Sequence, residues 1–251
     1  MVKCSNLSVK TRNKVLLENI SFSVNRGEFC VILGKNGSGK TSLLRTLSGN
    51  FKFDGEISIN SQSLKTMQAK NRAKQMAIMS QILPQPAISV RNLLAFGRQP
   101  YTGLSGTLSQ KDWEIVDKTL KDCFLENLAD AKVNLLSGGE RRKAFFGMML
   151  VQQAPLLLAD EPCANLDVEY SRLILSMLKE RKNFGDTILC ILHDVNDALE
   201  LADRILLLDC GKLVFNGKPE DFIRQNLAKK YFSLSPCTCI DENGKKNLIY
   251  R

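Results

Sequence analysis

The order of hydrophobic and polar positions along the chain predicts strands that alternate with helices. Several short runs are apolar with little interruption, which is typical of strands buried on both faces of a parallel sheet. They span 29–33, 76–80, 156–159, 187–192 and 205–208. Helical spacing of apolar residues appears between some of these runs, as at 173–178. This alternation predicts an α/β fold with a parallel-sheet core and right-handed crossovers.

Two other stretches alternate polar with apolar residues, which predicts strands with one buried face. In 20–24 the alternation leads through a turn into the next buried run, and this order predicts a hairpin-like β layer. The second stretch is 55–59, and the alternating strands predict a small antiparallel β subdomain. The polar stretch 61–75 predicts a loop or a short helix.

The middle of the chain changes to helical periodicity, from Ser89 to Gln153. Within it, Ser109 and Asp112 are spaced as a capping box ahead of an apolar helical face. This segment predicts an all-helical subdomain inserted into the α/β core. The single domain expected over 1–251 has a core at 1–86 and 154–235, a helical subdomain at 87–153, and a polar tail with no assigned role at 236–251.

Composition narrows the class of protein. A chain of 251 residues that is 44% hydrophobic can bury a substantial core. No apolar stretch predicts a membrane-spanning helix or a signal peptide, so we expect a cytosolic location. The eight cysteines are spread out, which favours reduced thiols, and only Cys237 and Cys239 lie close together. The net charge of +9 comes without a basic run, so nucleic acid is not an expected partner.

One loop carries a nucleotide-binding pattern. The stretch 34–41 fits G-x-x-x-x-G-K-[ST] at every fixed position, between a buried run and an apolar helical face that ends near Gly49. The backbone N–H groups of such a loop face a phosphate at the positive end of the helix. An ordinary Gly/Ser turn is the alternative, but strand, loop and helix in this order favour a phosphate loop. The residues expected to bind nucleotide are Gly34, Asn36, Gly37, Ser38, Gly39, Lys40, Thr41 and Ser42.

Further polar residues stand directly after other buried runs. Asp160 and Glu161 follow one run, and His193, the only histidine, follows another. Open α/β sheets bind ligands outside the carboxyl ends of their strands, so these side chains are expected to converge near the phosphates. One carboxylate can then serve Mg²⁺ and the other water. The alternatives are that Asp-Glu-Pro only ends a strand and that the histidine is structural.

A second candidate anion site lies at Leu136-Ser137-Gly138-Gly139-Glu140, ahead of a helical apolar pattern. With this stretch the chain resembles the ATP-binding cassette (ABC) ATPases, whose signature motif is LSGGE or LSGGQ. The family's motifs follow in order over nearly the whole chain: phosphate loop 34–41, Q-loop Gln81, signature 136–140, Asp160 and Glu161, D-loop 164–167, and switch histidine His193. The resemblance implies a P-loop NTPase fold of the RecA-like type, with ATP and Mg²⁺ as cofactors.

The resemblance also implies a head-to-tail pair of cassettes. ATP would lie between the phosphate loop of one copy and Ser137 and Gly139 of the other, so hydrolysis would require a homodimer, with Asp167 connecting the two sites. Within one copy, the family pattern implies that Lys40 holds phosphates, Thr41 and Asp160 hold Mg²⁺, Gln81 senses metal and water, Glu161 is the general base, and His193 contacts the γ-phosphate.

Three positions depart from the family pattern. The family usually has an aromatic residue that stacks on adenine where this chain has Thr11, so the contact with adenine is open. Arg12 is a candidate through its planar guanidinium. Lys35 stands where proline is common, and Cys163 where threonine is common. Neither replaces a group that performs chemistry, and an active ATPase is still expected.

The segment 96–100 resembles the G-R-x-P feature of cassettes from importers of iron-siderophores, haem and cobalamin. Its alternative is an ordinary helix end closed by glycine and proline. The resemblance implies that the helical subdomain and the Q-loop dock an integral membrane permease, and that a substrate-binding protein delivers the cargo. The chain would then lie peripherally on the cytoplasmic face of the inner membrane. Another class of ABC transporter, or a soluble ABC-type ATPase outside transport, is the alternative.

Overall fold

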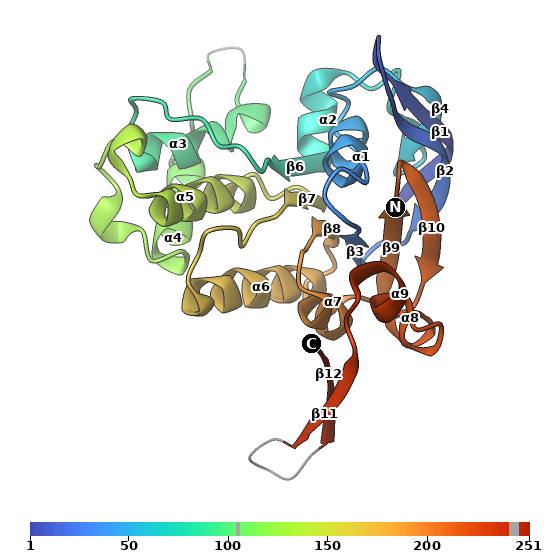
Figure 1. The fold of residues 1–251 in the computed structure, drawn as a ribbon. Helices are drawn as coiled ribbons and strands as arrows, with labels where there is room; N and C mark the ends of the chain where they lie inside the picture. Colours follow the sequence, from blue (N-terminus) through green and yellow to red (C-terminus); the bar gives the residue numbers. More distant parts are fainter. Residues whose placement is uncertain (104–105, 241–245) are drawn as a thin grey trace.

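The computed structural model describes residues 1–103, 106–240 and 246–251. An α/β core lies on one side and a helical lobe on the other (Figure 1). The strands are β1 Val2–Lys10, β2 Val15–Val24, β3 Phe29–Leu33, β4 Asp54–Ile59, β5 Gln62–Ser63, β6 Met76–Met79, β7 Leu156–Asp160, β8 Thr187–Ile191, β9 Arg204–Asp209, β10 Lys212–Gly217, β11 Pro236–Ile240 and β12 Lys246–Tyr250. The α-helices are α1 Lys40–Leu47, α2 Ala69–Gln75, α3 Val90–Phe96, α4 Gln110–Asp122, α5 Gly138–Val151, α6 Val168–Asn183, α7 Val195–Leu201, α8 Pro219–Arg224 and α9 Leu227–Phe232. Short 3-10 helices are η1 Gln99–Tyr101, η2 Glu126–Leu128 and η3 Val133–Leu135.

The central sheet has the strand order β10-β9-β3-β8-β7-β6. All neighbours in it pair in parallel except β10, which is antiparallel to β9 at one edge. Every residue of β3, β7 and β8 is buried, because helices or a second sheet cover both faces. The predicted parallel α/β core is confirmed.

The two faces of this sheet belong to different hydrophobic clusters, because successive side chains of a strand point to opposite faces. In β3, Phe29, Val31 and Leu33 join the cluster that extends into the helical lobe. Cys30 and Ile32 join the cluster beneath α1 and the second sheet. One strand therefore holds both halves of the core.

The second sheet is antiparallel and has the strand order β2-β1-β4-β5. It confirms the predicted antiparallel subdomain, but the hairpin-like layer of β2 with β3 was wrong, because the two strands lie in different sheets. Both edges of β3 are already paired, with β8 and β9, so β2 has no free edge to bind. Between β2 and β3 the turn residue Gly27 adopts φ +71, where glycine is favoured.

Two local predictions are confirmed in the helical lobe and beside it. The stretch 61–75 contains the short helix α2, preceded by the short strand β5. The capping box at the start of α4 is present: the hydroxyl of Ser109 accepts from the N–H of Asp112, and the Asp112 carboxylate accepts from the N–H of Ser109. The subdomain boundaries expected near residues 86 and 154 stay predictions.

Helices α3 and α5 pack closely where the G-R-x-P feature lies. Gly97 ends α3, and a Cβ there would lie 2.5 Å from the carbonyl oxygen of Met148. The buried guanidinium of Arg98 donates to Asp112 at 2.8 Å and to the carbonyl oxygen of Val151 at 2.9 Å. The segment is thus a helix end, and it also ties α3 to α4 and α5.

The tail after residue 235 has a structural place that the sequence did not predict. Strands β11 and β12 form an antiparallel hairpin that extends away from the core (Figure 1). Tyr250 is 5% exposed, and its N–H and carbonyl both hydrogen-bond the Asn196 side chain on α7, at 2.8 and 3.1 Å. Cys237 and Cys239 lie on β11. Among the described residues, no group of three or more His, Cys, Asp or Glu side chains is placed to hold a metal ion.

Candidate active site

The phosphate loop runs from the end of β3 to the first turn of α1. A Cβ at Gly34 (φ +152) would lie 2.4 Å from the carbonyl oxygen of Leu208, and Gly39 adopts φ +104. Both positions therefore require glycine. The loop curls back on itself through a 3.1 Å hydrogen bond from the N–H of Ser38 to the carbonyl oxygen of Lys35. Lys35 takes part here through its backbone carbonyl, a group that proline also offers.

The Lys40 ammonium lies inside the curl of this loop. Its Nζ donates to the carbonyl oxygens of Gly34 at 2.7 Å and Lys35 at 3.1 Å. Burial lowers the pKa of Lys40, while the nearby carboxylates of Glu161 and Asp160 act to raise it. The geometry places a cation against the backbone of the phosphate loop.

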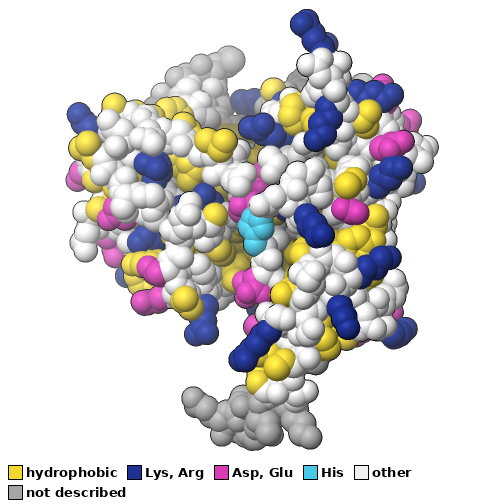
Figure 2. Space-filling view, in the orientation of Figure 1, with side chains coloured by type: hydrophobic (Ala, Val, Ile, Leu, Met, Phe, Trp, Pro, Cys, Tyr) yellow, Lys and Arg dark blue, Asp and Glu magenta, His cyan; other side chains and the backbone are white. Residues whose placement is uncertain are grey.

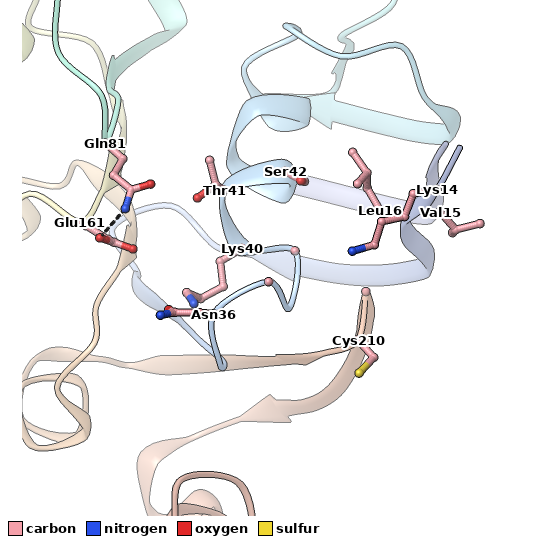
Figure 3. A pocket seen from close by; sticks show the side chains of 13 residues that line it. Lys14, Val15, Leu16, Asn36, Lys40, Thr41, Ser42, Gln81, Glu161 and Cys210 are labelled. Atoms are coloured by element: carbon pink, nitrogen blue, oxygen red, sulfur yellow. Dashed lines mark hydrogen bonds between the residues drawn. The ribbon is translucent and has the colours of Figure 1, made fainter. Parts of the chain in front are cut away.

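A pocket of about 550 Å³ opens beside the loop (Figure 3). The predicted residues that line it are Asn36, Gly37, Gly39, Lys40, Thr41, Ser42, Gln81 and Glu161. Gln81 and Glu161 lie across from the start of α1, and Thr41 points toward them (Figure 3). The fold thus brings the phosphate loop, the Q-loop and the carboxylate after β7 to one cavity.

Asp160 meets Thr41 beside the pocket, but among the described residues only Thr41 of the two lines it. The Thr41 hydroxyl donates to Oδ1 of Asp160 at 3.3 Å. Asp160 is 2% exposed, and burial raises the pKa of its carboxyl, an effect that the hydrogen bond from Thr41 opposes. A carboxylate and a hydroxyl beside a phosphate loop are oxygen ligands of the kind that Mg²⁺ prefers.

Three side chains meet at the carboxyl ends of neighbouring strands. Gln81 follows β6, Glu161 follows β7 and His193 follows β8. Nε2 of Gln81 donates to Oε2 of Glu161 at 2.8 Å, and Nε2 of His193 lies 2.6 Å from Oε1. Figure 2 shows the imidazole, in cyan, at the surface between the two lobes, with acidic side chains beside it. Each carboxylate oxygen of Glu161 therefore has a partner that orients it.

The signature residues lie in a separate hollow. Ser137 caps the N-terminus of α5, and Glu140 completes a capping box by accepting from the Ser137 N–H at 2.9 Å. The hydrogen bond from the Ser137 hydroxyl lowers the pKa of Glu140. The hollow has a volume of about 250 Å³, and it also contains Gly139 and Asp167. Within one copy, the structure does not bring Ser137 and Gly139 to the pocket of the phosphate loop.

Comparison with known proteins agrees with this arrangement. The family model described as "ABC transporter" matches residues 17–164. The chain belongs to the ABC transporter family. It is an ATP-binding cassette ATPase, a class of protein that binds nucleotide. Within the described ranges, no helix is long and apolar enough to cross a membrane.

Several relatives of this ABC ATPase are named for the import of petrobactin or hemin, or for the transport of ferric enterobactin. The petrobactin import ATP-binding protein YclP of Bacillus subtilis (strain 168) is 34% identical over 245 residues, with 96% of each chain covered. The hemin import ATP-binding protein HmuV of Plesiomonas shigelloides is 34% identical over 250 residues, covering 91% of this chain and 93% of HmuV. The ferric enterobactin transport protein FepC of Escherichia coli (strain K12) is 32% identical over 228 residues, covering 90% and 84%.

Solved structures share the fold of this ABC ATPase. A dimeric ATP-binding cassette in a post-hydrolysis state, bound to ADP and Pi, has a TM-score of 0.79 and 26% identity, covering 87% of this chain and 99% of that one. An inward-facing, putative metal-chelate type ABC transporter has a TM-score of 0.84 and 21% identity, covering 100% and 96%. The second likeness concerns the fold alone.

The far end of the ABC ATPase pocket holds residues that sequence reasoning missed. These are Lys14, Val15, Leu16, Cys210 and Gly211. Neither Thr11 nor Arg12 is among the described residues that line the pocket; Thr11 instead closes a turn through hydrogen bonds with Lys14. The turn at 209–212 was visible in the sequence, but its approach to the phosphate loop depends on the pairing of β9 with β3.

Proposed function

We propose that this chain is the ATP-hydrolysing subunit of an ABC importer for a metal chelate of the iron-siderophore, haem or cobalamin type. The transported class of compound is supported by the near full-length similarity to relatives named for petrobactin, hemin and ferric enterobactin transport. The observation that carries hydrolysis is the Glu161 carboxylate, which faces the pocket between Gln81 and His193.

ATP and Mg²⁺ fit the residues of the pocket. Backbone N–H groups of the phosphate loop, the Lys40 ammonium and the positive end of α1 favour the phosphates. Thr41, Asp160 and Gln81 would hold Mg²⁺, which when bound neutralises charge that develops on the phosphate oxygens. The buried Asp160 carboxylate, with Thr41 as its hydrogen-bond partner, supports this assignment.

Hydrolysis needs a base close to the attacking water. Glu161 would accept the proton, because its carboxylate lies at the pocket wall and hydrogen bonds fix its orientation. Gln81 would orient the same water, and His193, beside Glu161, would contact the γ-phosphate. Asp167, in the signature hollow, would connect one site of a dimer to the other.

A second copy of the chain would complete the site. Ser137 and Gly139 line a hollow apart from the phosphate-loop pocket, and the N-terminus of α5 opens into it. In a head-to-tail homodimer this helix end would face the triphosphate held by the other copy. The dimeric ATP-binding cassette that shares this fold supports the arrangement.

The helical lobe and the Q-loop would dock an integral membrane permease, with the chain on the cytoplasmic face of the cell membrane. Two exposed apolar side chains support this docking: Ile82, 80% exposed beside Gln81, and Phe96, 51% exposed at the end of α3. A substrate-binding protein would deliver the chelate to the permease.

The proposal is tested in cells and membranes of the source organism. An affinity-tagged chain, extracted in mild detergent, is expected to retain an integral membrane protein. Uptake of labelled ferric siderophores, haem or cobalamin is expected to fall in a deletion strain, and to return with the wild-type gene but not with Glu161→Gln. Absence of a bound membrane protein would contradict the transporter role, and unchanged uptake of all three cargo types would contradict the cargo class.

A further inference from the structure

Arg142 links the signature helix to the candidate active site. It lies in the second turn of α5, and the residue is 6% exposed. Its guanidinium spans two separate backbone segments: Nη1 donates to the carbonyl oxygen of Glu161 at 2.5 Å, and Nη2 donates to the carbonyl oxygen of Gln81 at 3.1 Å. A buried side chain of the helical lobe therefore holds the backbone at two residues of the pocket.

The backbone at Glu161 needs such support. Glu161 adopts φ +52, in the left-handed region that residues with a Cβ rarely occupy. A residue held there is strained and persists only where its surroundings fix it. The described partners of its carbonyl oxygen are the Arg142 guanidinium and the N–H of Ala164, at 3.1 Å. The direction of the Glu161 side chain depends on this backbone conformation.

The side chains of the same two residues are also bonded, since Nε2 of Gln81 donates to Oε2 of Glu161. Arg142 and this bond close a ring that fixes the end of β6 against the end of β7. The planar guanidinium suits the task, because it presents two donors at a fixed angle to two acceptors. A lysine at this position would offer a single ammonium group on a flexible stem.

We propose that Arg142 is a positioning residue for hydrolysis, which holds Gln81 and Glu161 in register and makes their placement depend on the orientation of α5. The inference rests on the proposed role of Glu161 as general base. Because Ser137 stands at the start of α5, a second copy that binds the signature would act on the helix that fixes this base. Binding of the second copy to the signature and alignment of Glu161 would thus be a single event.

Steady-state kinetics test the proposal. Arg142→Met keeps an unbranched apolar side chain but removes both donors, and turnover at saturating ATP is expected to fall by about 10- to 100-fold, since small misplacements of reacting groups cost rates of this order. The KM for ATP is expected to stay within about two-fold, because Arg142 is not among the described residues that line the pocket. Arg142→Lys, a milder change if the methionine variant folds poorly, is expected to give a smaller loss of turnover. Wild-type turnover in folded Arg142→Met or in Arg142→Lys would overturn the proposal.

Gln152→Leu is the matched control. Gln152 follows α5 directly, and its side chain also donates to two backbone carbonyls, those of Ala73 and Met76, away from the pocket. Gln152→Leu is expected to lose about as much thermal stability as Arg142→Met, but its turnover per folded molecule should stay unchanged. Equal losses of turnover in both variants would reduce Arg142 to a general support of the fold.

A double-mutant cycle separates this inference from the proposed function. In a Glu161→Gln background, Arg142→Met is expected to cause little further loss of turnover, because the group that it positions is already gone. A second loss of the full size would overturn the inference alone. Wild-type turnover by Glu161→Gln by itself would instead overturn the proposed role of Glu161.

Discussion

Glu161 combines a strained backbone with a side chain that is held on both oxygens. Gln81 and His193 bond the carboxylate, and Arg142 bonds the carbonyl. Glutamine has the same shape as glutamate and can keep the bond to one partner, but it cannot accept a proton from water. Replacing Glu161 by glutamine therefore separates ATP binding from ATP hydrolysis.

We expect Glu161→Gln to bind ATP as tightly as the wild type and to hydrolyse it about 10²- to 10⁴-fold more slowly, the usual contribution of a general base. With ATP and Mg²⁺ the variant should accumulate as a dimer, because the step that releases the second copy is blocked. Size-exclusion chromatography and phosphate release measure both effects. Glu180→Gln, on α6 outside the pocket, is the control, and rapid turnover by Glu161→Gln would remove Glu161 from this role.

At the residue scale, the sequence was sufficient to predict that polar side chains directly after buried strands lie near one another. Asp160, Glu161 and His193 each follow a buried apolar run, so their meeting could be predicted from the parallel order of the strands. Arg142 carries no such local signal, because its role depends on how closely α5 approaches the ends of β6 and β7. Lys14 likewise carries no local signal, because its place in the pocket depends on how the turn before β2 lies beside the phosphate loop.

The helix α5 connects the signature to the rest of the helical lobe. Ser137 caps its N-terminus, its second turn holds Arg142, and its last turns pack against α3 at Gly97. The spacing leaves no room for a side chain at that glycine, whose φ is in the ordinary helical region. A substitution at Gly97 therefore tests packing and not backbone strain.

Gly97→Ala is expected to destabilise the fold by about 1–3 kcal/mol, the usual cost of overpacking. In a chain of this size each kcal/mol lowers the melting temperature by roughly 2–4 °C. Differential scanning calorimetry measures the shift. Gly103→Ala, where a Cβ would meet nothing within 4 Å, should leave the melting temperature unchanged. A melting temperature for Gly97→Ala equal to that of Gly103→Ala would show that the two helices can move apart.

At the element scale, periodicity predicted the buried strands and the capped helix α4, because burial on both faces and capping leave direct signals in the sequence. Periodicity failed where the arrangement depends on which strands pair with one another. The order of β2, a turn and β3 is compatible with a hairpin, and only the occupied edges of β3 exclude it. The polar tail gave no signal for β11 and β12, whose place depends on contacts with Asn196.

At the scale of the whole molecule, the phosphate loop and the signature form two incomplete sites on one chain. They line different hollows, of about 550 and 250 Å³. If each hollow is completed by a second copy, activity is a property of the pair, and defects in the two hollows should complement one another.

Mixing two inactive variants tests this complementation. Lys40→Ala removes the loop cation and Ser137→Arg blocks the signature, so each alone should have almost no ATPase activity. In a mixed dimer, one site keeps Lys40 from one copy and Ser137 from the other, and activity should return to a fraction of the wild-type level. Lys40→Ala mixed with Lys40→Met is the control that should stay inactive. If the first mixture also stays inactive although mixed dimers form, the composite site is wrong.

The alternation of side chains along β3 has a consequence for how the molecule comes apart. Phe29, Val31 and Leu33 belong to the cluster that reaches the helical lobe, while Cys30 and Ile32 belong to the cluster under the antiparallel sheet. Neither cluster can loosen without releasing a strand that the other needs. The two lobes therefore share one melting transition, and heat should not leave one lobe folded beside an unfolded one.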